Sequence, residues 1–171
     1  MTDMPKRKMP DVPWLTKEGY IDMSRVPIDG TLRDAAGPNR QRARDAIGVL
    51  GSCAHAGRTD AGMFLMGLLL STADSDLERR ADIVRALQSH ATQPCATLLF
   101  GELRRVKSSN TTRTYLDEVI DALRRFPGEI VEDGFDDLAA DTSFTPRMRE
   151  KFRRAAGQTV DRRGDDEDDD W

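Results

Sequence analysis

Four side chains of the sequence could bind a metal, because thiolates and imidazoles are the usual ligands of zinc. They are Cys53, His55, His90 and Cys95. Their spacings, C-x-H and H-x4-C, do not match those of structural zinc sites. A cysteine in a helical core and a histidine at a helix end are common without a metal. We therefore expect no metal or other cofactor, and two free, buried thiols.

Paired carboxylates are the second set that could do chemistry. Glu132, Asp133, Asp136 and Asp137 could serve acid–base catalysis or bind calcium. They lack the D-x-D-x-D-G spacing of an EF-hand loop and lie in a segment with helical periodicity, so they predict a solvated helix face. The sequence also contains no nucleophile elbow, phosphate-binding glycine loop or dinucleotide fingerprint, and it does not favour an enzyme.

Basic residues form the third set, and they recur about once per predicted helix. They are Arg79, Arg80, Arg85, Arg104, Arg105, Lys107, Arg124 and Arg125. If the helices stack, these side chains could align into an arginine stripe that neutralises the phosphates of a nucleic acid. Arginine near a helix C-terminus is also ordinary dipole chemistry, and the net charge of the chain is −4.

Composition predicts an all-α protein of the cytoplasm. The 171 residues are 33% charged and 6% aromatic, a mixture typical of amphipathic helices. Two cysteines are too few for a disulfide scaffold, and the charged N-terminus is followed by prolines rather than by the apolar segment of a secretory signal. The longest apolar run, residues 61–70, is too short to cross a bilayer, so we expect no membrane partner.

Three regions follow from the pattern along the chain. Residues 1–36 contain four prolines and predict an extended arm whose first dozen residues are disordered. Residues 37–157 show helical periodicity, and residues 158–171 predict a disordered acidic tail. The expected helices lie near residues 38–56, 59–70, 75–90, 94–107, 111–126, 130–138 and 145–157. The second is apolar almost all round, which predicts a central position.

Capping residues predict where several of these helices begin. Thr59 and Asp60 can cap the second helix, and Ser75 with Glu78 forms a capping box before the third. Pro94 suits the first turn of the fourth helix. Gly157 is expected to end the seventh.

A repeat of about 36 residues runs through the helical region. The segments 45–52, 82–89 and 118–125 each begin with an acid and place leucine at the sixth position. Each is followed by a turn and a second apolar helix, as expected for a two-helix unit that buries its apolar face against its neighbours.

These segments resemble HEAT repeats, including the HEAT-like repeats of phycobilisome lyases. The resemblance implies a short right-handed α-solenoid of about three helical hairpins with a C-terminal capping helix; a non-repeat helical bundle is the alternative fold. In the implied pairing, the first expected helix pairs with the second, the third with the fourth and the fifth with the sixth. The chain lacks the proline that often kinks the first helix of a HEAT unit.

The implied function is that of a non-enzymatic adaptor whose groove and charged surface bind a protein partner. A nucleic-acid-binding module is the alternative, with residues 165–170 folding over the basic seventh helix as an autoinhibitory shield. Bilin lyases and HEAT-like base-excision enzymes share the architecture. No lyase residue can be placed here, however, and base excision would need aromatic residues in the groove, whereas Trp14 and Trp171 lie outside the repeats.

Overall fold

The computed structural model describes residues 12–160, and this part of the chain is all-helical. The helices are α1 (Asp29–Ala36), α2 (Arg40–His55), α3 (Thr59–Ser71), α4 (Leu77–Leu87), α5 (Gln93–Arg105), α6 (Arg113–Leu123), α7 (Gly128–Ala140) and α8 (Pro146–Val160). An isolated bridge between Leu15 and Ile21 is the only β-structure among these residues. All seven expected helices are present, within a few residues of their predicted ends.

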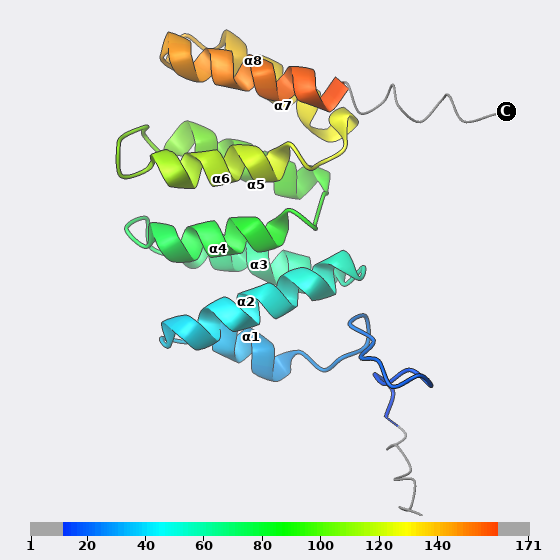
Figure 1. The fold of residues 1–171 in the computed structure, drawn as a ribbon. Helices are drawn as coiled ribbons and strands as arrows, with labels where there is room; N and C mark the ends of the chain where they lie inside the picture. The colour runs from blue at the N-terminus through cyan, green and yellow to red at the C-terminus, as the bar shows by residue number, and fades with distance from the viewer. Residues whose placement is uncertain (1–11, 161–171) are drawn as a thin grey trace, which may run out of the picture.

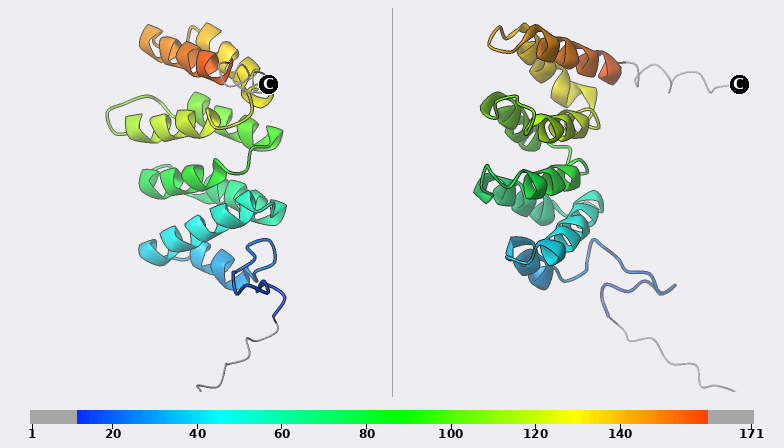
Figure 2. Two further views of the ribbon diagram at one scale, coloured as in Figure 1. Left: turned by 45° about the vertical axis from the view of Figure 1, so that its right-hand side comes forward. Right: turned by 60° about the vertical axis from the view of Figure 1, so that its left-hand side comes forward.

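Consecutive helices pack as pairs, α1 with α2, α3 with α4, α5 with α6 and α7 with α8 (Figure 1). The pairs stack on one another, so that α1, α3, α5 and α7 lie in one layer and α2, α4, α6 and α8 in the other (Figure 2). We call these the first and the second layer. Within the second layer, α2 packs on α4 and α4 packs on α6, whereas α3 and α5 of the first layer touch little.

The predicted pairing is partly wrong: α2 and α3 do pack on each other, but α4 with α5 and α6 with α7 touch little. The difference arises from α1, which forms where the sequence predicted an extended arm: the chain carries no proline between Pro27 and Pro38. Ala35 of α1 is fully buried, and the Arg79 guanidinium donates to its carbonyl at 2.5 Å and so satisfies the end of the helix. Because α1 supplies the first helix of the first pair, the helices form four pairs rather than three pairs and a cap.

Capping differs from the prediction at two helices. The N-cap of α4 is Asp76, whose carboxylate accepts from the backbone N–H of Arg79, rather than Ser75 with Glu78. At α3 the N-cap is Arg58, with no side-chain cap. Pro94 does lie in the first turn of α5, as predicted. The last helix continues through Gly157, because a glycine inside a helix costs only about 1 kcal/mol.

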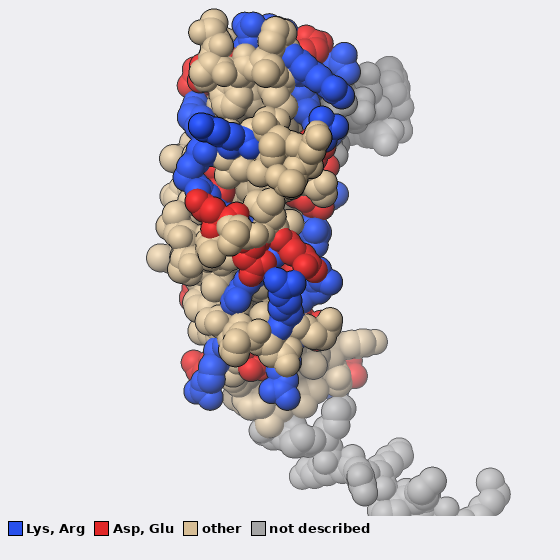
Figure 3. All heavy atoms as spheres, turned by 90° about the vertical axis from the view of Figure 1, so that its left-hand side faces the viewer, with Lys and Arg blue, Asp and Glu red and all other residues tan. Residues whose placement is uncertain are grey.

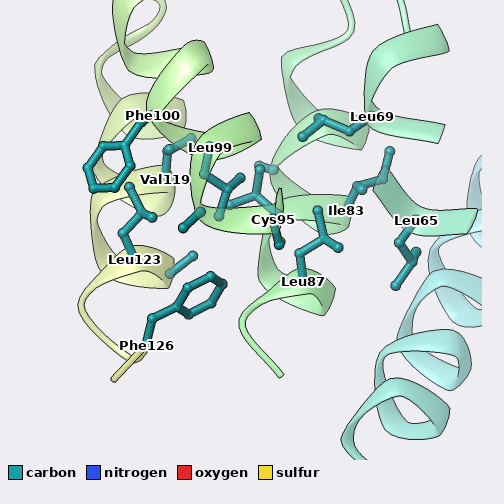
Figure 4. Packing of buried hydrophobic residues seen from close by; sticks show 14 of the residues in the cluster. Leu65, Leu69, Ile83, Leu87, Cys95, Leu99, Phe100, Val119, Leu123 and Phe126 are labelled. Carbon is teal, nitrogen blue, oxygen red and sulfur yellow. The ribbon is translucent and has the colours of Figure 1, made fainter. Parts of the chain in front are cut away.

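The core runs continuously through the stack. Leu50, Leu87 and Leu123, the sixth residues of the three repeated segments, are each fully buried and lie on α2, α4 and α6. In Figure 4, Cys95 and Leu99 of α5 lie between Leu87 of α4 and Leu123 of α6. At the far end the rings of Phe100 and Phe135 meet edge to face at 5.2 Å and join the third pair to the fourth.

Helix α3 is not central, contrary to the prediction from its composition. Leu65 and Leu69 are fully buried, but Met63 is 65% exposed and Leu70 70% exposed. One side of α3 packs on α2 and α4, and the other side forms part of the surface of the first layer.

Two glycines permit close packing between elements. A Cβ at Gly62 of α3 would lie 2.3 Å from the imidazole of His90, and one at Gly134 of α7 would lie 2.3 Å from the ring of Phe100. Contacts this short are incompatible with a side chain unless the ring moves. Each glycine therefore leaves room for a neighbouring ring in the core.

We expect Gly62→Ala to lower the free energy of unfolding by about 1–3 kcal/mol, because the new methyl group displaces the buried His90 ring. Gly67→Ala in the same helix is the matched control. Nothing lies within 4 Å of its Cβ position, and the substitution should stabilise by about 0.5–1 kcal/mol. Urea unfolding of both variants measures the two effects, and equal shifts would contradict this packing.

Candidate interaction surface

A groove of about 940 Å³ lies on the second layer, between α2 and α4. Small residues are part of its lining, among them Gly48, Gly51, Ser52 and Ala86. The two helices approach closely at one point: a Cβ at Gly51 would lie 3.0 Å from the Cβ of Ala86. Small side chains permit this close approach, and the groove lies along it.

Polar and apolar side chains border this groove at different places. Arg44, Asp82 and Arg85 lie along one part, His55, Gln88 and Ser89 lie near the C-terminal ends of α2 and α4, and Met23 reaches it from the arm. A smaller hollow of about 220 Å³ continues between α4 and α6, where Arg85 and Gln88 again take part. The candidate surface thus spans three consecutive helices of the second layer.

Ion pairs connect successive helices of this layer. Arg44 of α2 pairs with Glu78 at 2.8 Å and Asp82 at 2.9 Å on α4. Arg85 of α4 pairs with Glu118 of α6 at 3.2 Å. Lys151 of α8 pairs with Asp117 of α6. We call these contacts the charge ladder. They neutralise Arg44, Arg85 and Lys151 with carboxylates of the same protein, which weakens the attraction of these cations for phosphate.

The repeated acid of the sequence motif has its physical explanation here. Asp82 and Glu118, the first residues of the second and third repeated segments, each accept from an arginine of the preceding second-layer helix. Asp45 begins the first segment and accepts instead from Gln41 in its own helix at 2.9 Å. In the second and third segments the acid therefore links one pair of helices to the next.

Arg80 is buried and not a surface residue, which corrects its assignment to the arginine stripe. It is 2% exposed. Its guanidinium donates to the carboxylate of Glu102 and to the carbonyls of Leu69, at 3.2 Å, and Thr72, at 2.6 Å, at the end of α3. It also lies 5.7 Å from the ring centre of Tyr115. This guanidinium binds groups inside the core and does not contribute to the surface.

Glu102 accepts hydrogen bonds from two further residues of this buried cluster. The hydroxyl of Tyr115 donates to Glu102 at 2.6 Å, and Arg105 donates to it at 3.1 Å. Arg105 also pairs with Asp74 at 2.7 Å. Burial opposes ionisation of Glu102, but the donors Tyr115 and Arg80 prevail and hold its pKa below the ordinary value of 4.5. Burial, followed by the bond to Glu102, raises the pKa of Tyr115.

The other predicted basic residues do not form one stripe. Arg79 is half-buried and bound to α1, and Arg124 pairs with Asp121 at 3.2 Å. Arg104, Lys107 and Arg125 are exposed. Arg104 and Lys107 lie on the side of the stack where α3 turns into α4 and α5 into α6, whereas Arg124 and Arg125 lie on the opposite side, where α6 turns into α7. Figure 3 shows acidic and basic side chains interleaved on the first of these sides.

The predicted acidic face is present on α7, in the first layer. Asp133, Asp136 and Asp137 are exposed, and Glu132 is half-buried. The predicted shield at residues 165–170 lies outside the described residues. Of the bases that it would cover, Arg153 and Arg154 both pair with Glu150.

The possible metal ligands do not gather. Within residues 12–160, no three His, Cys, Asp or Glu side chains are grouped so as to hold a metal ion. Cys53 and Cys95 are free and buried, as predicted. Burial raises the pKa of the Cys95 thiol to about 12, so it is protonated at neutral pH and a poor nucleophile. Burial also lowers the pKa of His90.

The sequence pattern did not identify the groove. Its signal was available in the glycines and alanines of the repeated segments, at Gly48, Gly51 and Ala86, but small residues alone do not show whether two helices face each other. Within the described part of the chain, no helix is both long and apolar enough to cross a membrane. Comparison with protein-family models, curated proteins and solved structures finds no match.

We expect Glu102→Gln to lower the free energy of unfolding by about 3–5 kcal/mol, because it leaves the Arg80 charge buried without its counter-charge. Tyr115→Phe removes one hydrogen bond and should cost about 1–3 kcal/mol. Urea unfolding at neutral pH measures both; a loss below 1 kcal/mol for Glu102→Gln would contradict the role of the ion pair.

The same residue predicts a pH dependence. Since the pKa of Glu102 in the folded state is below 4.5, its ionised form stabilises the fold above that pH, and the stabilisation disappears as the pH falls through the lowered pKa. The free energy of unfolding should therefore fall less between neutral pH and pH 3 in Glu102→Gln than in the natural sequence. Identical pH profiles would be inconsistent with this assignment.

Proposed function

We propose that the protein is a non-enzymatic adaptor, a short right-handed α-solenoid of HEAT-like helical pairs that binds a segment of a partner protein in the groove between α2 and α4. The observation that carries the proposal is the groove itself, whose lining combines small residues with hydrogen-bonding groups. The hydrogen-bonding groups can satisfy exposed peptide groups and side chains of a partner, while the small residues admit the chain closely.

The arrangement of the layers supports this choice of surface. In a curved stack, helices on the inner side approach one another more closely than those on the outer side. Over the first three pairs the contacts of α2 with α4 and of α4 with α6 are extensive, whereas α3 and α5 touch little; at the fourth pair α5 packs on α7 and α6 touches α8 little. Over the first three pairs this difference favours the second layer as the concave side, the side on which solenoids offer extended binding surfaces.

The charges favour a protein over a nucleic acid at this site. Binding along a phosphate backbone requires several cations that are available to replace counterions. On this face Arg44 and Arg85 are already paired with Asp82 and Glu118. The residues of the predicted arginine stripe are divided between two opposite sides of the stack. The groove lining also contains no phenylalanine, tyrosine or tryptophan on which a base could stack.

Two glycines allow a matched test. Gly48 lines the groove and Gly157 lies on α8 in the last helical pair, and neither has an atom within 4 Å of its Cβ position. Glutamine at either position therefore adds a side chain of equal size without a clash and improves helix propensity. Gly48→Gln obstructs the groove, whereas Gly157→Gln leaves it open.

We expect Gly48→Gln to weaken capture of the partner at least about tenfold, equivalent to 1.4 kcal/mol, while Gly157→Gln captures normally. The measurement is quantitative pull-down from lysate of the source cells after nuclease treatment, followed by titration of each purified partner. Equal capture by both variants would remove the groove from the proposal. Capture that nuclease abolishes would favour the nucleic-acid alternative instead.

A further inference from the structure

The first layer presents a second surface, chemically unlike the groove. We call it the outer face: the sides of α3, α5 and α7 that point away from α2, α4 and α6. On α3 it carries Met63, Met66 and Leu70, spaced three and four residues apart and so placed on one side of the helix. Met63 and Leu70 are 65% and 70% exposed, fractions that leave most of each apolar side chain in water.

The exposed side of α5, the next helix of the first layer, is also free of charge over most of its length. Residues 61–73 contain no acid or base, and the exposed side of α5 carries Pro94, Thr97 and Gly101 before the first cation at Arg104. Gly67 and Gly101 both face open space. Where glycines face outward, the backbone of an approaching helix can come closer than side chains would otherwise allow.

The outer face becomes acidic on α7, which packs beside α5. The side chains of Asp133, Asp136 and Asp137 are exposed. Unlike the carboxylates of the charge ladder, they form no ion pair with a base within residues 12–160. Three neighbouring carboxylates repel one another, and cations from elsewhere would relieve that repulsion.

We propose that the outer face binds an amphipathic helix of a partner protein, which places apolar residues on α3 and lysine or arginine residues over α7. Neighbouring packed helices are spaced about 8–10 Å apart, and α3 and α5 touch little, so the path from α3 across α5 to α7 is at least about 20 Å. A helix of about 14 residues or more covers this distance. Charge complementarity selects the occupant, because the carboxylates of α7 attract a basic segment.

The same carboxylates disfavour other occupants. A nucleic acid or an anionic lipid surface would bring phosphates against Asp133, Asp136 and Asp137. A second copy of the chain, docked α3 to α3, would bury the apolar side chains but leave the carboxylates of α7 without cations. Of these occupants, a basic amphipathic helix alone complements both the apolar part of the outer face on α3 and its acidic part on α7.

Selection from a library of 18-residue helical peptides tests this proposal with the full chain as bait. The Leu70→Lys variant serves as counter-bait, because a cation replaces the most exposed apolar side chain of the outer face without entering the core. We expect enriched peptides to carry leucine, methionine or phenylalanine toward one end and lysine or arginine toward the other. No enrichment, or enrichment of acidic peptides, would overturn the proposal.

Titration of the enriched peptides locates their site. Affinity should fall at least tenfold for Leu70→Lys, fall for the combined variant Asp133→Asn, Asp136→Asn and Asp137→Asn, and weaken with added salt. Val49→Lys is the matched control, since Val49 is 40% exposed on α2, and it should bind normally. Binding that ignores Leu70→Lys but is lost in Gly48→Gln would place the peptide in the groove, which supports the proposed function and refutes this one.

Sedimentation of the unliganded protein distinguishes self-association. We expect a sedimentation coefficient independent of concentration. A dimer that forms with rising concentration and is abolished by Leu70→Lys would show that a second copy occupies the outer face, and would overturn the proposal of a basic partner helix.

Discussion

The buried ion pair between Arg80 and Glu102 is the contact on which the middle of the stack depends. One guanidinium satisfies two carbonyls at the end of α3, pairs with α5 and lies near Tyr115 of α6, while starting in α4. A charge inside a helical core is tolerated only when its hydrogen-bonding partners are in place. The four central helices must therefore adopt one mutual arrangement, because sliding or rotating any of them would leave a buried charge without a partner.

The second layer depends on weaker and more exposed contacts. Each rung of the charge ladder is partly solvated, and such pairs contribute little stability individually. Their effect is instead one of specificity: an arginine of one helix meets an acid of the next at a spacing that recurs with the repeat. The ladder therefore aligns α2, α4 and α6, while the apolar core supplies most of the stability.

The two layers thus offer different chemistry to partners. The groove of the second layer has small residues, neutralised charges and hydrogen-bonding groups at its border. The outer face has exposed methionine and leucine at one end and exposed carboxylates at the other. A stack of paired helices makes this possible. One side of each helix packs against the other layer, and the side chains on the opposite side face the solvent and are free to vary.

The sequence by itself determined the helical class, the position of nearly every helix and the recurring acid and leucine, because these follow from periodicity within one segment. It also indicated the acidic side of α7 and the buried thiols. Pairing, burial of Arg80 and exposure of Leu70 were decided by tertiary structure alone. All three depend on which sides of separate helices meet: α1 shifted the pairing by one helix, the carboxylate of Glu102 and the carbonyls of α3 drew a cation into the core, and the first layer left one side of an apolar helix uncovered.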